Sequence, residues 1–260
     1  HSGGGILTAS VLALDDRVKA AAPSCYLCAL PTVLKTTGPG DAERRSGYRV
    51  EKLALRPEEG IVLPASLFEP EKASSGRVVL YVHEKGKDAA AAPGSPIEKL
   101  ALAGARVLAV ELRGTGQSQQ SQASWGMIGP GWQDITTAYC LGRSYVGMRA
   151  EDILVAARYA TKQLDGGPVA ALDLIAVGNV GVPALHAAAL EPALFASVKL
   201  RQTLVSWASV IERRVTLNQY VNVVQGALRE YDLPDLAATL GGKRAVEDPL
   251  DAVGKPIAPK

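Results

Sequence analysis

Apolar and polar positions follow two different periods along the chain from residue 48 onward. Short apolar or alternating runs are typical of strands, and the longer stretches between several of them have the spacing of helices. The predicted strands are residues 48–55, 61–68, 78–82, 106–112, 172–177, 196–200 and 245–247. The predicted helices are residues 96–103, 133–141, 149–164, 183–190, 217–230 and 236–240.

The order of these elements predicts an α/β fold. Residues 48–55 alternate apolar and polar, and a Glu-Glu-Gly turn leads into residues 61–68, which indicates an antiparallel hairpin. Strands then alternate with helices, so we expect a mainly parallel sheet with helices on both faces. Residues 31–47 are rich in glycine, proline and charge and predict a loop or linker. We place a boundary there, between residues 1–45 and residues 46–260.

Composition excludes several classes of partner. The chain has 260 residues, of which 47% are hydrophobic and 21% charged, as is usual for a globular protein. A formal net charge of +2, with basic residues spread along the chain, gives no reason to expect a nucleic-acid partner. No apolar run approaches the roughly 18 residues of a membrane span, so no membrane partner is expected either.

The cysteines predict neither a disulfide framework nor a metal site. The three are Cys25, Cys28 and Cys140, and no second pair completes a zinc site with Cys25-x-x-Cys28. We therefore expect buried, unreactive thiols.

A tight strand-to-helix turn lies near the middle of the predicted sheet. The strand at residues 172–177 runs into Gly178-Asn179-Val180-Gly181, and a helix rich in alanine and leucine follows. This turn resembles the Gly-x-Ser-x-Gly nucleophile elbow of α/β-hydrolases. The resemblance places Val180 at the nucleophile position, framed by Gly178 and Gly181. Valine has no hydroxyl or thiol, so we expect the turn to keep the architecture without the nucleophile.

Two further stretches carry the same resemblance. Glu111-Leu112-Arg113-Gly114-Thr115-Gly116-Gln117-Ser118 resembles the Asp-x-Arg-Gly-x-Gly-x-Ser loop of α/β-hydrolases. His1-Ser2-Gly3-Gly4 resembles the end of the Gly-x-Ser-Gly-Gly elbow of bacterial acetyl xylan esterase-like hydrolases. An offset of about 178 residues aligns Ser2 with Val180. The chain is thus similar to tandem proteins of that kind, with part of a first unit followed by a degenerate second unit.

The resemblance implies a role for each matching residue. Ser2 takes the nucleophile position of the first unit, and the Gly3 N–H would help to form an oxyanion hole. In the second unit His83, in the segment 81–86, lies where family members carry a His-Gly-Gly oxyanion loop. His83 is a candidate base, although a part in the shape of that loop is the favoured interpretation. Asp251 takes the place of the acidic triad member, or simply caps a turn.

The histidines leave the triad incomplete. A serine nucleophile needs a base within hydrogen-bond reach, and no histidine follows His186. His186 itself falls within the helix after the elbow, where we expect a core or helix-flank side chain.

The family resemblance implies ester hydrolysis through a seryl acyl-enzyme, without a cofactor. The implied substrate is a small ester or an acetylated polysaccharide, and the implied location is secreted or periplasmic. Because no complete triad is visible, the alternative is a catalytically silent pseudohydrolase that binds a polysaccharide or contacts a partner. A third possibility is an unrecognised site around His83, Glu84 and Glu111. Trp125 and Trp132 either pack as a lid or stack on sugar rings.

Overall fold

The computed structural model describes residues 32–35, 43–72, 76–119, 126–162, 164 and 171–257. Residues 1–31 of the predicted first unit lie outside the described residues, and with them His1, Ser2, Gly3, Cys25 and Cys28. Trp125 also lies outside them. Whether residues 1–31 form part of a separate unit stays a prediction.

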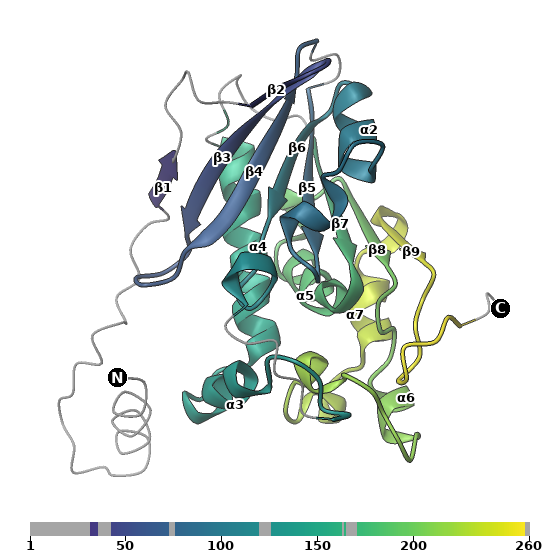
Figure 1. Cartoon of the computed structure of the whole chain (residues 1–260). Helices are drawn as coiled ribbons and strands as arrows, with labels where there is room; N and C mark the ends of the chain where they lie inside the picture. Colours follow the sequence, from purple (N-terminus) through teal and green to yellow (C-terminus); the bar gives the residue numbers. More distant parts are fainter. Residues whose placement is uncertain are drawn as a thin grey trace.

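A nine-stranded sheet forms the centre of the described part of the chain (Figure 1). Its order is β1-β3-β4-β6-β5-β7-β8-β9, and β2 pairs with β3. The strands are β1 (Thr32–Lys35), β2 (Glu43–Arg45), β3 (Tyr48–Arg56), β4 (Leu63–Pro70), β5 (Arg77–His83), β6 (Arg106–Val110), β7 (Ala171–Val177), β8 (Ser197–Arg201) and β9 (Arg244–Glu247).

The register of the sheet confirms the predicted α/β class. Strands β3 and β4 form the antiparallel hairpin, with Tyr48 opposite Pro70 and Leu55 opposite Leu63. Strand β4 pairs antiparallel with β6, while β5 pairs parallel with both β6 and β7. Strands β8 and β9 extend the parallel part. The carboxyl ends of these parallel strands therefore meet at one edge, which is where such sheets bind ligands.

The prediction of a loop or linker at residues 31–47 is partly wrong. Thr32–Lys35 and Glu43–Arg45 are strands that pair antiparallel with β3. Both segments thus belong to the same sheet as the following strands. The nearby charged residues and proline made these two strands hard to recognise from the sequence, because edge strands tolerate polar side chains that interior strands do not.

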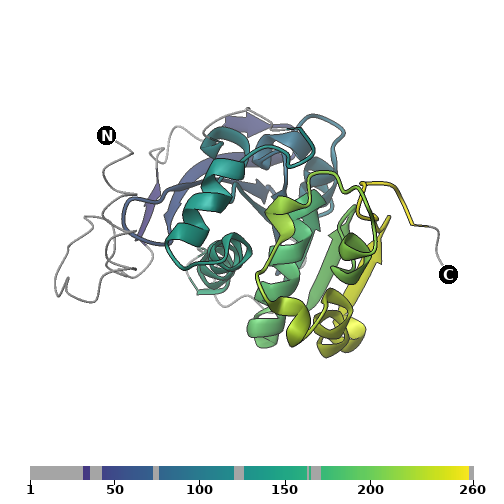
Figure 2. The same ribbon diagram turned by 90° about the horizontal axis from the view of Figure 1, so that it is seen from below.

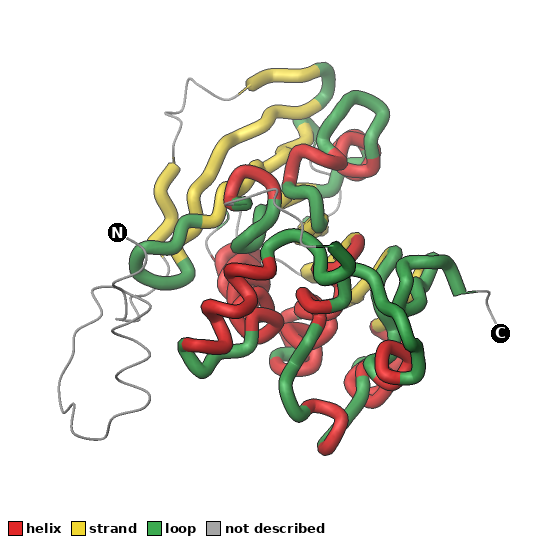
Figure 3. The backbone as a smooth tube through the Cα atoms, turned by 60° about the horizontal axis from the view of Figure 1, so that its bottom comes forward, coloured by secondary structure: helices red, strands yellow, loops and turns green. Residues whose placement is uncertain are grey.

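Helices cover both faces of the sheet unequally (Figures 2 and 3). One face packs on α4 and α5, which lie side by side, and α5 also contacts α7. The other carries a smaller apolar cluster beneath α2, which contacts β4 and β6. The α-helices are α2 (Pro96–Leu102), α3 (Trp132–Cys140), α4 (Tyr145–Lys162), α5 (Gly181–Leu190), α6 (Ala208–Ile211) and α7 (Leu233–Thr239).

The helix predicted at residues 217–230 is absent. Two short 3-10 turns, Tyr220–Asn222 and Ala227–Arg229, stand in its place. Gly226 between them has a φ of 78°, and Asn218 has a φ of 56°. Residues in the left-handed conformation interrupt an α-helix, so the segment folds as an irregular loop with two short 3-10 turns.

Three features concern the surface chemistry of the described residues. Cys140 is exposed at the end of α3, contrary to the expected burial, because it falls on the polar side of that helix. Within the described residues no group of histidine, cysteine and carboxylate side chains is suited to a metal ion. No described helix is long and apolar enough to cross a membrane.

Candidate functional site

A cavity of about 630 Å³ opens at the carboxyl ends of the parallel strands. This volume lies in the range of small-molecule sites. Its wall includes Glu84 after β5, Asn179 after β7 and Gln202 after β8. Lys85 after β5 and Asp251, which follows β9, also line the cavity. Of the residues for which the sequence predicts a role, the wall includes Asp251 and Glu84. It does not include His83, Gly178, Val180 or Gly181.

The elbow has its left-handed residue at Gly178. Strand β7 ends at Val177, and Gly178 follows with a φ of 82°. Val180 has helical backbone angles, φ −73° and ψ −6°, and is fully buried in the main apolar cluster. The structure therefore places Gly178, not Val180, at the tip of the turn, and the predicted position of Val180 is corrected. Two residues of a 3-10 turn separate that tip from the start of α5.

The Glu84 carboxylate occupies the space in front of Gly178. Glu84 Oε2 accepts a hydrogen bond from the Asn179 N–H at 3.0 Å, and the Glu84 N–H donates to the Val177 carbonyl at 3.0 Å. A Cβ atom on Gly178 would collide with the Glu84 carboxylate. In serine hydrolases of this architecture, the N–H after the nucleophile belongs to the oxyanion hole. Here an internal carboxylate accepts from that N–H.

From the sequence, Glu84 has only a minor role. It is predicted only as part of a third possible site, beside His83 and Glu111. A usable signal was present, since the segment reads His83-Glu84-Lys85-Gly86 where the family resemblance leads one to expect His-Gly-Gly. An acidic side chain in place of glycine brings a group that can reach a neighbouring N–H.

His83 does not face the cavity as a base. Its Nδ1 accepts a hydrogen bond from the Lys85 N–H at 3.0 Å, so its remaining proton lies on Nε2. Burial lowers the pKa of His83 below its usual value. Among the described residues that line the cavity, none is a histidine. The hydrogen bond to Lys85 fits the favoured interpretation, in which His83 shapes the loop.

His186 is a structural side chain of α5, as predicted. Its Nδ1 lies 2.8 Å from the Val182 carbonyl oxygen, and its Nε2 lies 3.1 Å from the Tyr231 hydroxyl. Its ring also packs on Trp207, with 5.6 Å between centroids. Burial lowers the pKa of His186, although the contact with the Val182 carbonyl opposes this shift. His186 is thereby held in an aromatic cluster and is not available as a base.

Asp251 lines the cavity but organises its own turn. Its Oδ1 accepts hydrogen bonds from the N–H groups of Val253 and Lys255, at 3.0 and 2.9 Å. Its Oδ2 pairs with Arg213 at 3.3 Å. The Lys255 N–H contributes most to lowering the pKa of Asp251, followed by that of Val253 and by Arg213. These contacts support the turn interpretation, and they also keep the carboxylate charged.

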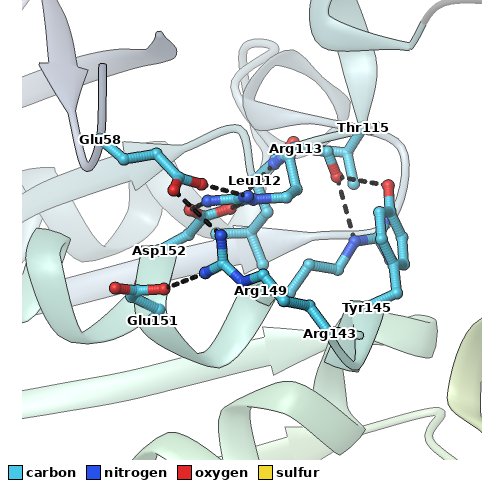
Figure 4. A network of polar contacts seen from close by, with 9 residues as sticks. All are labelled: Glu58, Leu112, Arg113, Thr115, Arg143, Tyr145, Arg149, Glu151 and Asp152. Atoms are coloured by element: carbon cyan, nitrogen blue, oxygen red, sulfur yellow. Dashed lines mark hydrogen bonds and ion pairs between the residues drawn. The ribbon is translucent and has the colours of Figure 1, made fainter. Parts of the chain in front are cut away.

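A buried network ties the Arg113 loop to α4 (Figure 4). Arg113 pairs with Asp152 at 2.5 Å and with Glu58 at 2.7 Å. Burial opposes the charge of Arg113, yet these two carboxylates raise its pKa above the usual value. Arg149 donates to the Arg113 carbonyl at 3.0 Å and to Asn179 Oδ1 at 3.3 Å. The network therefore also holds the Asn179 side chain, one residue after the elbow tip.

Glu111 holds the same Arg113 loop through a backbone hydrogen bond. It is 1% exposed, accepts the Gln117 N–H at 3.0 Å and lies 3.5 Å from Lys87 Nζ. A Cβ on Gly116 would collide with the Glu111 carboxylate, so glycine is required there. Glu111 does not line the cavity. A reactive centre joining His83, Glu84 and Glu111 thus finds no support in this geometry.

No protein-family model matches the chain, and no curated protein matches it. Solved structures do. A candidate acetyl xylan esterase of Bacteroides fragilis superposes with a TM-score of 0.64 at 15% identity, over 94% of this chain and 66% of that one. Acetyl xylan esterase 1 of a Thermoanaerobacterium species gives 0.53 at 15%, over 97% and 89%. A glucuronoyl esterase of Solibacter usitatus gives 0.53 at 14%, over 88% and 69%.

The chain has an α/β-hydrolase fold. This likeness confirms the α/β-hydrolase fold that the elbow and the Arg-Gly-x-Gly loop predict. It also explains why the cavity lies where the strands β5, β7 and β8 end. The chain spans about two thirds of the length of the Bacteroides structure. At such identities the fold is shared, and substrate and activity are matters for proposal.

Proposed function

We propose that the α/β-hydrolase unit of this chain is catalytically silent and binds acetylated polysaccharide in its cavity. The observation that carries the proposal is the Glu84 carboxylate, which accepts the Asn179 N–H and fills the space beside Gly178. A tetrahedral oxyanion needs that N–H, and a nucleophile needs that space. Neither is free for a substrate while Glu84 holds its place.

The surroundings of the elbow support the same function. Gly178 has no side chain to attack an ester, and the described cavity wall carries no histidine to act as a base. The cavity is nonetheless open and of ligand size, at about 630 Å³. The loss of reactive groups without loss of the cavity favours binding over turnover. The polysaccharide class comes from the esterases that share this fold.

The hydrolytic hypothesis through Ser2 concerns residues outside the described part of the chain, and it stays a prediction. One assay separates it from the proposal. The full chain and its Ser2→Ala variant are incubated with an aryl acetate and with a fluorophosphonate probe. We expect no turnover and no labelling in S2A. Turnover that persists in S2A would refute the silence of the second unit, and labelling lost only in S2A would establish Ser2 as a nucleophile.

Binding is tested on acetylated xylan. We expect saturable binding that S2A leaves unchanged. Leu217 and Leu228 form a matched pair, since they are 43% and 40% exposed and only Leu217 lines the cavity. Leu217→Trp narrows the cavity and should weaken binding several-fold, whereas Leu228→Trp should not. Equal effects of the two substitutions would place the binding site elsewhere.

A further inference from the structure

A second cavity, of about 510 Å³, opens at the end of the sheet where the parallel strands β5 and β6 begin and where β2 lies (Figure 1). The candidate site is at the opposite ends of these strands. We call the second one the arginine cavity, because each of the strands β2, β3, β5 and β6 brings an arginine to its lining. These arginines are Arg44, Arg49, Arg77 and Arg106, and the lining also includes Glu69 and Glu71.

Two of the arginines are held by carboxylates that are more buried than they are. Arg49 pairs with Glu69, and Arg77 pairs with Asp173. The arginine side chains are 59% and 50% exposed, whereas the carboxylates are 15% and 10% exposed. A guanidinium has more N–H donors than a pair with one carboxylate uses. Arg49 is therefore fixed in position and still has donors for a ligand.

Arg44 and Arg49 lie directly opposite each other in the pair of strands β2 and β3. Like charges at facing positions destabilise a sheet, because their Cβ atoms are only about 5 Å apart on the same face. Arg44 is exposed, so a ligand can reach it. An anion between the two guanidinium groups would replace this repulsion by attraction to a shared centre. The pair is thus the place in the arginine cavity that most favours a negative group.

The acidic residues around the arginine cavity restrict the kind of anion. The four arginines, set against Glu69, Glu71 and Asp173, leave a single positive charge in excess. This small excess suits a monoanion better than a sulfate or phosphate dianion. Glu71 is exposed, and a carboxylate only accepts hydrogen bonds, so it favours a ligand that brings hydroxyl groups. A sugar acid has both features, a single carboxylate on each ring and several hydroxyl groups.

We propose that the arginine cavity binds an acidic oligosaccharide, with a uronate carboxylate between Arg44 and Arg49 and a ring hydroxyl that donates to Glu71. A planar guanidinium matches a carboxylate with two parallel hydrogen bonds, and Arg49 already meets Glu69 through two of its nitrogens. This inference concerns a site other than the candidate functional site and does not rest on the proposed function.

Isothermal titration calorimetry on the full chain tests the assignment. The probes are trigalacturonate, its fully methyl-esterified form and sodium sulfate. We expect the ester to bind at least about tenfold more weakly than the acid, because it offers the arginines no charge. Sulfate, a dianion without a hydroxyl group, should also bind more weakly than the acid.

Arg44→Gln should weaken trigalacturonate at least about fivefold. The fold should tolerate this change, since Arg44 is exposed and faces a like charge. Arg56→Gln is the matched control, because Arg56 is an exposed arginine of β3 that does not line the cavity. It should change the affinity by less than about twofold.

Glu71→Ala separates a sugar acid from a simple anion. It should weaken trigalacturonate, which loses an acceptor, and strengthen sulfate, which loses a repulsion. Absence of trigalacturonate binding, equal affinity of the acid and its ester, tighter binding of sulfate, or equal effects of R44Q and R56Q would overturn the assignment. A loss of affinity in Lys85→Gln but not in R44Q would place the acid in the cavity of the candidate site and overturn it as well, while the proposed function would stand.

Discussion

At the scale of single residues, the space around Gly178 is already full. Its φ of 82° suits glycine, and a Cβ there would collide with the Glu84 carboxylate. We expect Gly178→Ala to lower the free energy of unfolding by about 2–3 kcal/mol, through backbone strain and crowding together. In a Glu84→Ala background the crowding is relieved, and the same substitution should cost only about 1 kcal/mol. Urea denaturation of the four proteins measures this coupling, and equal costs in both backgrounds would contradict it.

His186 makes stability depend on pH. Burial lowers its pKa, so the folded protein binds fewer protons than the unfolded chain, whose histidines titrate near 6.5. The contribution of neutral His186 to stability is therefore fully present above about pH 6.5. It is lost as the pH falls from there through the lowered pKa of the folded state. We expect the free energy of unfolding to decrease between pH 7.5 and pH 5.5, and to decrease less in His186→Phe.

His83→Gln is the control for that measurement, because the pKa of His83 is lowered too and His83 is also only partly buried. Subtracting its effect isolates His186. A pH profile that His186→Phe leaves unchanged would show that the aromatic cluster tolerates the charged ring.

At the scale of elements, the ion pair of Arg113 and Asp152 joins the loop after β6 to α4. Asp152 is 0% exposed, so Arg113→Met leaves a buried carboxylate without its cation. We expect a loss of about 3–5 kcal/mol, most of which the double variant Arg113→Met/Asp152→Leu restores. Arg49→Met is the control, since Arg49 is 59% exposed in its pair with Glu69 and should cost under about 1 kcal/mol. Thermal or urea unfolding distinguishes these cases.

The elements show how far the sequence alone could go. Strands such as β5 and β7 were predictable because continuous apolar runs suit strands buried on both faces. The structure of the segment 217–230 was not predictable, because nothing in the neighbouring sequence indicates that Gly226 adopts a left-handed conformation. The elbow was found but displaced by two residues, since the pattern of glycines does not say which one carries the positive φ. The contact between Glu84 and Asn179 joins residues far apart in sequence, and only the fold brings them together.

At the scale of the whole molecule, the two faces of the sheet are unequally protected. Helix α2 buries Ile97 and Ala101, whereas α4 buries 12 of its 18 residues, eight of which belong to the larger cluster. Local opening costs less where fewer apolar contacts must break. We therefore expect amides of α2 to exchange hydrogen at a lower opening free energy than those of α4. Native-state hydrogen exchange monitored by mass spectrometry measures the difference, and equal protection of the two helices would contradict it.

The contact between Glu84 and the elbow also constrains the order in which this protein can change. A serine at position 178 would meet the Glu84 carboxylate before it met any substrate, so that substitution alone brings a penalty and no gain. Position 84 must change first, and this step removes the acceptor of the Asn179 N–H while the nucleophile is still missing. Under the proposed function, the gain of a nucleophile at position 178 thus passes through an intermediate that has neither the Glu84 contact nor the nucleophile. The contact between Glu84 and Gly178 therefore makes each single substitution unfavourable, which explains how a silent unit of this architecture would remain silent.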